Sequence, residues 1–385
     1  MKKFLLSFSS IVYVFFNVDA QTVPGKVIDH SPASSQVYIG SPSICILPNG
    51  NYVASHDYFG TNSTETSQGI TYVFKSENKG KTWTKISKIE GQFWSNLFVH
   101  KNELYIMGTF KEYGNVIIRK SVDGGLTWTE PTDSNNGLLL IGEYHTAPVP
   151  IIEHQGKLWR AMEDAMGPIK GWGKMFGSFM LSIPIDSNLL KAENWIKSNS
   201  VRYDSTYLDS HFGGWLEGNA VVAPNGRIVN MLRVSYTING DEKAAIINIS
   251  DDGSVASFYK EKGFIDFPGG GKKFTIRYDT KSKLYWTLSN FIPKEFKGSN
   301  SASTRNTQAL SCSKDLINWK ICHIILQSPN ISNHGFQYLD WQFDKRDIIA
   351  VSRTAFDDSE GGAHDMHDAN FLTFHRIKNF RKLSR

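Results

Sequence analysis

Two short segments of this chain are near copies of each other and begin 45 residues apart, at Ser76 and Ser121. Residues 76–83 read SENKGKTW and residues 121–128 read SVDGGLTW, so both follow the pattern S-x-(D/N)-x-G-x-T-W. In such a turn the Asp or Asn side chain folds back onto the backbone, and the glycine tolerates a positive φ. Weaker copies begin at Ser250 and Ser313. Turns that repeat at this period between strand-like runs predict a β-propeller.

Strand-like runs fill the rest of the chain, and we expect no amphipathic helix longer than two turns. Three runs within residues 334–380 predict the blade that closes the ring. At the period of the two turns, the chain has room for about seven blades. We therefore expect a single all-β domain over residues 21–385, a seven-bladed propeller of four-stranded antiparallel blades.

Residues 1–20 have the features of a signal peptide. Lys2 and Lys3 precede an apolar stretch, and small residues precede Gln21. The stretch is too short and too interrupted by Ser to predict a membrane span, and no Cys stands near the cleavage site to carry a lipid anchor. We expect a periplasmic or secreted monomer that does not associate with a membrane.

The balance of charges and the number of cysteines exclude two further classes of protein, nucleic-acid-binding proteins and disulfide scaffolds. The net charge of +5 comes without the runs of Lys and Arg typical of nucleic-acid binding, so no nucleic-acid partner is expected. Three cysteines are too few for a disulfide scaffold. Cys312 and Cys322 flank a turn, however, and could face each other across a hairpin.

Polar and aromatic residues gather at the ends of the predicted strands. In a propeller the inner strands line a central channel, so such residues converge on the axis, where a pocket is the first candidate site. The candidates for catalysis or substrate binding are His56, Tyr144, His145, Tyr207, His211, Trp215, Arg233, Arg277, Tyr278, Arg305 and Arg353.

The loop of residues 357–368 is acidic and rich in Gly and His. His364 and His367, with His334 nearby in sequence, have a spacing compatible with a structural zinc or calcium ion. The chemistry expected below requires no cofactor.

The repeated turns resemble the Asp-boxes of sialidase-type propellers. Sialidases bind the carboxylate of sialic acid with three Arg, the first of which lies in a motif F/Y-R-I-P near the start of the chain. Here the corresponding residues 39–48 read IGSPSICILP, and no Arg precedes Arg119. The resemblance therefore implies the fold and argues against sialidase activity.

A wider resemblance covers nearly the whole mature chain, through the segments SHDYFG, YHTAP, WRAMEDA, WLEGNAV, FPGGGKKFTIRYD, HGFQYLDW, VSRTAFDD and HDANFLTFHRI. The chain is similar to the ulvan lyases, which cleave rhamnose–uronate chains by β-elimination, and to the α-L-rhamnosidases that remove rhamnose from glucuronate. Either activity implies a poly- or oligosaccharide of rhamnose and uronate as the partner.

The lyase resemblance assigns roles to several candidates. Removal of the proton beside a uronate carboxylate requires Arg to neutralise the carboxylate, and His or Tyr as base and acid. His145 and Tyr207, or His211 in place of Tyr207, would share the proton transfers. Arg233 would neutralise the carboxylate. Tyr278 would complete the catalytic group. The predicted contacts to the substrate are Arg353, Arg277, Trp215, Tyr144 and Arg305.

Three alternatives stay open at this point. The same machinery could expel water from a terminal uronate. The rhamnosidase resemblance would instead place catalysis on His56, within SHDYFG, and the usual paired carboxylates of a glycosidase have candidates in Glu163, Asp164 and Glu217. A glycan-binding propeller without activity would keep only the aromatic surfaces.

Overall fold

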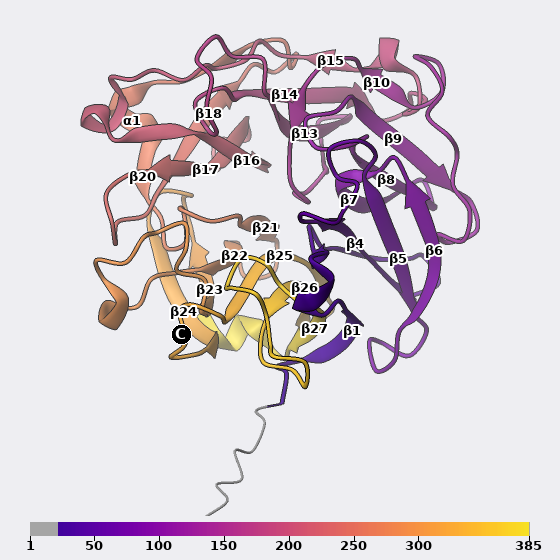
Figure 1. The fold of residues 1–385 in the computed structure, drawn as a ribbon. Coiled ribbons are helices and arrows are strands. Elements are labelled where there is room, and N and C mark those ends of the chain that lie inside the picture. The colour runs from indigo at the N-terminus through magenta and orange to yellow at the C-terminus, as the bar shows by residue number, and fades with distance from the viewer. Residues whose placement is uncertain (1–21, 385) are drawn as a thin grey trace, which may run out of the picture.

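A computed structural model describes residues 22–384, which form six antiparallel sheets around a common axis (Figure 1). The prediction of an all-β propeller with four-stranded blades is confirmed, and the prediction of seven blades is wrong. Blade 3 begins at Tyr144 and blade 4 at Phe212, a much longer interval than the spacing of the first two turns, because long loops join the strands of the later blades. The predicted signal peptide lies outside the described residues.

Each blade runs outward from the axis, with its first strand innermost. Blade 1 consists of β2 (Tyr38–Ile39), β3 (Ser43–Ile46), β4 (Tyr52–Phe59), β5 (Ile70–Ser76) and β6 (Thr84–Glu90). Blade 2 consists of β7 (Phe93–His100), β8 (Glu103–Thr109), β9 (Val116–Ser121) and β10 (Leu138–Leu140). Blade 3 consists of β11 (Tyr144–His145), β12 (Ile152–His154), β13 (Lys157–Asp164), β14 (Gly177–Pro184) and β15 (Ile196–Lys197).

The other half of the ring has the same plan. Blade 4 consists of β16 (Phe212–Val222), β17 (Ile228–Tyr236), β18 (Lys243–Ile249), β19 (Ala256–Ser257) and β20 (Phe264–Asp266). Blade 5 consists of β21 (Thr275–Asp279), β22 (Leu284–Asn290), β23 (Thr307–Ser313) and β24 (Trp319–Gln327). Blade 6 consists of β25 (Gly335–Asp344), β26 (Asp347–Ala355), β27 (Phe371–Ile377) and β1 (Lys26–His30). The helices are short: η1 (Ala33–Ser35), η2 (Ala192–Asn194), η3 (Tyr207–Ser210), α1 (Lys260–Gly263), η4 (Lys294–Phe296) and η5 (Phe380–Ser384).

The ring closes by pairing the two ends of the described chain. The first strand, β1, pairs antiparallel with β27, so that Lys26 lies opposite Phe374 and His30 opposite Phe371 (Figure 1). Residues from both ends therefore share blade 6, and this closure leaves the ring without a gap.

The repeated turns join the third and fourth strands of blades 1, 2, 4 and 5. In the second turn the carboxylate of Asp123 accepts hydrogen bonds of 3.0 Å from the backbone N–H groups of Leu126 and Thr127. Although burial opposes the shift, these bonds and that of the Thr127 hydroxyl lower the pKa of Asp123 to about 2. The turn geometry expected from the sequence is present.

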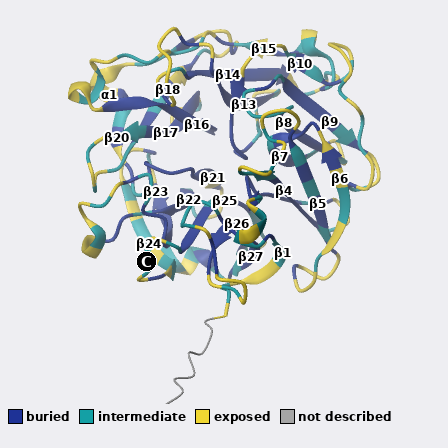
Figure 2. Cartoon of the chain, in the orientation of Figure 1, coloured by how far each residue is buried: buried dark blue, intermediate teal, exposed yellow. Residues whose placement is uncertain are grey.

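The hydrophobic core consists of six main clusters, each between two neighbouring blades. The inner strands are buried, and exposure increases toward the outer loops (Figure 2). Four Trp are almost completely buried within these clusters: Trp159, Trp215, Trp286 and Trp341. No helix among the described residues is long and apolar enough to cross a membrane.

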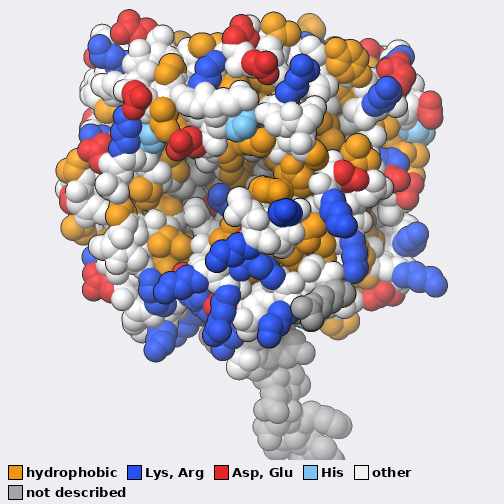
Figure 3. Space-filling view, turned by 180° about the vertical axis from the view of Figure 1, so that it is seen from behind, with side chains coloured by type: hydrophobic (Ala, Val, Ile, Leu, Met, Phe, Trp, Pro, Cys, Tyr) orange, Lys and Arg blue, Asp and Glu red, His pale blue; other side chains and the backbone are white. Residues whose placement is uncertain are grey.

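The view from behind shows Lys and Arg side chains gathered over the lower part of that face (Figure 3). Lys345 and Arg346, in the turn between β25 and β26, are exposed, as are Lys378 and Lys382 near the end of the described chain. On blade 5, Cys312 and Cys322 lie on adjacent strands with their sulfur atoms 2.8 Å apart, as free thiols.

Candidate active site

A cavity of about 530 Å³ lies on the axis, at the face where the inner strands begin. All six blades line it, because in each blade the start of the first strand, the end of the second strand and the loop after it reach this face. Its ionisable residues other than tyrosine are Asp57, Glu65, Glu112, His145, Glu217, Arg233, Arg305, Arg353, Asp365 and His367. Its aromatic residues are Phe59, Phe93, Trp94, Tyr113, Trp172 and Tyr338.

Three of the inner strands carry the same irregularity where they line the cavity. The register of β7, β16 and β25 shifts around Trp94, Glu217 and Tyr338. Each of these residues has a positive φ, of 48°, 48° and 54° respectively. A positive φ is costly for such residues, and β-bulges turn a side chain out of its normal alternation. The bulges aim all three side chains into the cavity.

Tyr338, Glu217 and Arg233 form a hydrogen-bonded chain. The Tyr338 hydroxyl donates to Oε1 of Glu217 at 2.6 Å, and Nη1 of Arg233 donates to Oε2 at 3.0 Å. Burial alone would raise the pKa of Glu217, but Arg233, His145 and Tyr338 together hold it below its ordinary value. Burial and the nearby Glu217 carboxylate raise the pKa of the Tyr338 phenol. At neutral pH the pair is therefore a phenol beside a carboxylate.

Arg305 and Arg353 are buried cations on the same side of the cavity. Arg305 donates to the backbone oxygen of Ala302 at 2.8 Å and to the side chain of Gln337. Arg353 donates twice to the backbone oxygen of His367, at 2.5 and 3.1 Å. Burial lowers the pKa of both, that of Arg305 to about 10. Neither forms an ion pair within residues 22–384, and a buried charge without a counter-ion is costly, so the site is suited to an anion.

The opposite side of the cavity is aromatic. Trp94 packs edge-on against His145 and Tyr113, with ring centroids 4.6 and 5.5 Å apart. Trp172, in the loop between β13 and β14, is 53% exposed. Because blades 2 and 3 lie across the ring from blades 5 and 6, Trp94 and Trp172 lie on the far side of the cavity from Arg305 and Arg353.

A group of carboxyl side chains from blades 1 and 2 completes the lining. Burial, with the neighbouring Glu112 and Asp57, raises the pKa of Glu65 to about 7, although its carboxylate accepts a hydrogen bond of 3.1 Å from Gly60. Burial likewise raises the pKa of Glu112. A carboxyl group that keeps its proton near neutral pH can act as a general acid.

Asp57 has a different role, since it holds the backbone of the site. Its two carboxylate oxygens accept hydrogen bonds of 2.5 Å from the N–H groups of Ser41 and Trp94. Burial raises the pKa of Asp57 to about 6 despite these bonds. Gly40 packs directly on Asp57, and a side chain at this position would collide with its carboxylate. The start of blade 1 therefore contributes backbone and no cation to the cavity.

His145 lines the cavity from blade 3 and stacks on Phe176, with ring centroids 4.4 Å apart. Its Nδ1 lies 3.2 Å from Oε2 of Glu163. The other oxygen of Glu163 accepts a hydrogen bond of 3.0 Å from the N–H group of Gly218, next to the bulge at Glu217. Glu163 thus has two contacts: one orients His145, and the other supports the backbone of the bulge at Glu217.

Six residues named as candidates from the sequence meet at this cavity: His145, Glu217, Arg233, Arg305, Arg353 and His367. The other predicted substrate contacts lie elsewhere. Trp215 and Tyr144 are buried in the clusters between blades. Arg277 donates to the backbone oxygen of Trp341 at 2.5 Å and lies near Asp340, beyond the cavity.

The other residues predicted to be catalytic also lie outside the cavity. Tyr207 packs among aromatic rings of blade 4. Tyr278 is 45% exposed and packs against Tyr285. His211 is exposed and lies beside Thr237. His56 is completely buried, and its ring nitrogens lie 2.9 Å from Asp29 Oδ2 and from the backbone oxygen of Asp57. This contact joins blade 1 to β1 of blade 6, which is a structural role.

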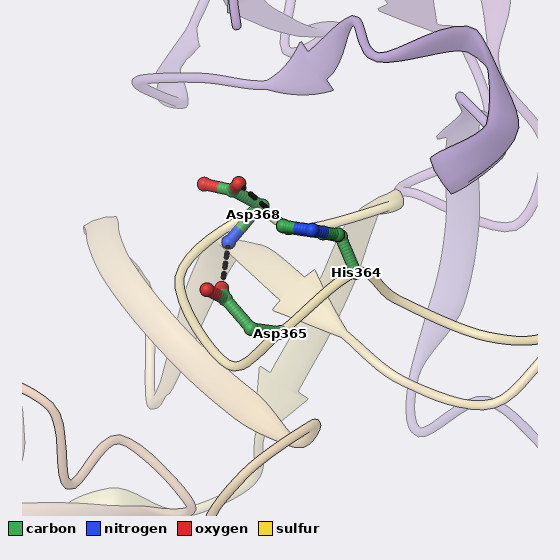
Figure 4. A group of neighbouring side chains, drawn as sticks. All are labelled: His364, Asp365 and Asp368. Atoms are coloured by element: carbon green, nitrogen blue, oxygen red, sulfur yellow. Dashed lines mark hydrogen bonds and ion pairs between the residues drawn. The ribbon is translucent and has the colours of Figure 1, made fainter.

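The three histidines predicted as metal ligands do not lie together. Side-chain donors of His364, Asp365 and Asp368 lie within 4.8 Å of one another (Figure 4), and Nδ1 of His367 lies 2.8 Å from Asp368. His334 instead contacts Ser328 at 2.7 Å and Asp357 at 3.2 Å. One imidazole and two carboxylates match the ligands that zinc accepts, so a structural metal stays a prediction, with Asp365 and Asp368 in place of His334 and His367.

The residues that sequence reasoning missed are Tyr338, Glu65, Glu112, Trp94 and Trp172. Tyr338 lies in the run FQYLDWQF, where it has the pattern of a core residue. Only the bulge brings it to the cavity, and the sequence gives no sign of the bulge. Glu217 was among the candidate carboxylates, but its pairing with Tyr338 joins two distant strands.

No family model and no curated protein matches this chain. Solved structures share its fold. The α-L-arabinanase of Penicillium chrysogenum is 16% identical, covers 94% of this chain and 99% of its own, and has a TM-score of 0.55. A protein of unknown function from Dyadobacter fermentans is 15% identical over 93% and 99%, with a TM-score of 0.59. A Hadza microbial sialidase is 14% identical over 93% and 69%, with a TM-score of 0.59. At these identities the comparisons establish the fold alone.

Proposed function

We propose that this protein is a glycoside hydrolase that removes a hexuronic acid from a glycan, with Tyr338 as its nucleophile. The observation that carries this proposal is the Tyr338 hydroxyl, which bonds to the ionised Glu217 beside three buried arginines. The names of the structures with the same fold, an arabinanase and a sialidase, support a glycan as the substrate.

The arginines select the substrate. Arg305 and Arg353 bind the carboxylate of the sugar, since planar guanidinium groups bind carboxylates bidentately. Arg233 stays paired with Glu217. The apolar face of the sugar packs on Trp94 and Trp172 across the cavity. The absence of a cation from the start of blade 1 favours a uronic acid over sialic acid. The sequence resemblance to uronate-active propellers points the same way.

The reaction proceeds in two steps. Tyr338 attacks the anomeric carbon and passes its proton to Glu217, while Glu65 protonates the leaving oxygen and the carbon–oxygen bond of the glycoside breaks. Water then attacks the anomeric carbon, gives its proton to Glu65, and the bond to Tyr338 breaks as the phenol recovers its proton from Glu217. The configuration at the anomeric carbon is retained.

A tyrosine suits an anionic sugar for an electrostatic reason. A carboxylate nucleophile would approach a substrate that itself carries a carboxylate, and the two charges repel in a buried site. A neutral phenol avoids this repulsion until it attacks. Glycosidases with a Tyr nucleophile are a known exception to the rule of two carboxylates.

A second candidate is β-elimination on a uronate, which the position of His145 favours. This imidazole lines the same cavity as the three arginines, so it could remove the proton beside a carboxylate that they neutralise. The product would be an unsaturated uronate rather than a saturated sugar. Expulsion of water from a terminal uronate is the variant of this reaction that leaves the glycan intact.

The experiment separates these reactions by their products. The protein is incubated with methylumbelliferyl glucuronides of both anomeric forms and with rhamnose–glucuronate oligosaccharides. Fluorescence and free saturated uronate report hydrolysis, and ultraviolet absorbance reports an unsaturated uronate. Hydrolysis that disappears in Tyr338→Phe and persists in His211→Ala supports the proposal. An unsaturated product that requires His145 would replace it with the elimination.

A further inference from the structure

A second hollow of about 490 Å³ adjoins the axial cavity on the side of blades 1 and 6. The two spaces share Phe59 and Glu65 as a common wall. The loop after β4 and the loop between β26 and β27 supply most of the remaining lining, which includes Gln36, Tyr38, Thr61, Ser63 and His364.

We propose that this hollow binds the sugar that leaves, and that this sugar is neutral. The assignment rests on the proposed function and deepens it, since it defines the substrate as a uronic acid linked to an uncharged sugar. The uronic acid occupies the axial cavity and its partner occupies the second hollow, so the bond that breaks lies beside Glu65.

The chemistry of the lining favours an uncharged, hydroxylated ligand. Gln36, Thr61 and Ser63 offer amide and hydroxyl groups, which hydrogen-bond to sugar hydroxyls. No Lys or Arg lines this hollow, whereas three Arg line the axial cavity. The ionised carboxylate of Asp368 in its lining would repel a second carboxylate or a sulfate.

The hollow also has a flat aromatic surface. The imidazole of His364 stacks on Tyr38, with ring centroids 5.7 Å apart and planes 18° apart. His364 is largely exposed, so one face of its ring is accessible. Tyr38 packs in turn on Phe59, at 5.5 Å, and the guanidinium of Arg353 lies 4.3 Å from the Phe59 ring. This series of contacts connects the proposed subsite to the guanidinium group that binds the carboxylate.

The wall between the two spaces is where an acid must act. A general acid that assists departure of a sugar has to reach the oxygen between the two sugars. Glu65 lines both spaces. If one sugar occupies each space, the oxygen that joins the two sugars lies beside Glu65.

The test compares two substrates that share the uronic acid. Glucuronyl-rhamnose needs the second hollow, whereas glucuronyl fluoride does not, because fluoride is small and leaves without a proton. Thr61→Trp fills the hollow, His364→Ala removes its stacking surface, and Thr132→Trp, on an exposed loop of blade 2, is the matched control. We expect kcat/KM for glucuronyl-rhamnose to fall about tenfold in Thr61→Trp and severalfold in His364→Ala, with glucuronyl fluoride unchanged.

Each other outcome overturns the assignment. Equal losses on both substrates would mean that the hollow only supports the fold, and no loss on either would mean that it is unused. Turnover of glucuronyl fluoride without any turnover of glucuronyl-rhamnose would exclude a neutral leaving sugar. If the parent protein hydrolyses neither substrate, the proposed function itself fails, and the assignment fails with it.

Discussion

The hydroxyl of Tyr338 lies 2.6 Å from Oε1 of Glu217, although the two residues are 121 positions apart in the chain. One belongs to β25 of blade 6 and the other to β16 of blade 4, and both have a positive φ at a bulge. The contact requires two independent distortions of the inner strands, so it is costly to maintain. We infer that the distortions persist because the pair does the chemistry.

The first prediction follows from this contact. In Tyr338→Phe the nucleophile is lost while the shape of the cavity stays, so kcat should fall on the order of 1,000-fold or more, and binding of the uronic acid should change little. Steady-state kinetics and calorimetry with free glucuronate measure the two effects separately. Weaker binding together with an unchanged kcat would assign Tyr338 to recognition instead.

Arg305 should show a conflict between stability and function. It is a buried cation without a carboxylate partner in the described chain, so Arg305→Met, which keeps the apolar volume, should raise the melting temperature. The same change should weaken binding of glucuronate by about tenfold or more, because one charge-assisted contact is lost. Arg346→Met, on the exposed turn after β25, is the control and should alter neither quantity. A less stable Arg305→Met protein with normal binding would give Arg305 a structural role.

The raised pKa of Glu65 predicts how kcat/KM depends on pH. Because its pKa is raised to about 7, the acid form is lost above that pH, and kcat/KM for a glycoside should decline there. Glu65→Gln should be slow with glycosides at every pH. It should release about one equivalent of fluoride rapidly from glucuronyl fluoride, because fluoride leaves without a proton, and then slow down, because the attack of water still needs Glu65 as its base. If kcat/KM of the variant declined with pH in the same way, the decline would belong to another titrating group.

The same shift has a consequence for stability. The folded pKa lies above the unfolded value, so the folded state binds more protons than the unfolded state between about pH 4.5 and 7, and stability falls as pH rises through this window. Glu65→Gln should reduce this loss, and the raised pKa values of Asp57 and Glu112 account for what remains. Urea unfolding of both proteins across the window checks the sign, and a parallel pH dependence of the two would contradict it.

The sequence predicted the propeller because the turns at Ser76 and Ser121 use local chemistry, which adjacent residues determine. It overestimated the number of blades, because the spacing of two turns carries no information about long loops in blades 3 to 5. Arg233 and Arg353 were found because a cation within an apolar strand is conspicuous, and Arg305 because it stands at the start of a predicted strand. Tyr338 was missed because the direction of its side chain depends on a bulge. Tyr278 and Tyr207 were named as candidates although they lie outside the cavity, because a position at a strand end does not indicate which face the side chain reaches.

The thiols of blade 5 provide the last prediction. Cys312 on β23 and Cys322 on the outermost strand β24 have sulfur atoms 2.8 Å apart, so little movement is needed to join them. Incubation with oxidised glutathione should convert the two thiols to a disulfide, with release of reduced glutathione and loss of two hydrogens from the protein mass. Cys45 should stay reduced, because it is buried and burial raises the pKa of its thiol. The cross-link should increase the free energy of unfolding by about 2 kcal/mol relative to an equally treated Cys322→Ser protein. Three titratable thiols in the unfolded protein after this treatment would show that the pair does not form a bond.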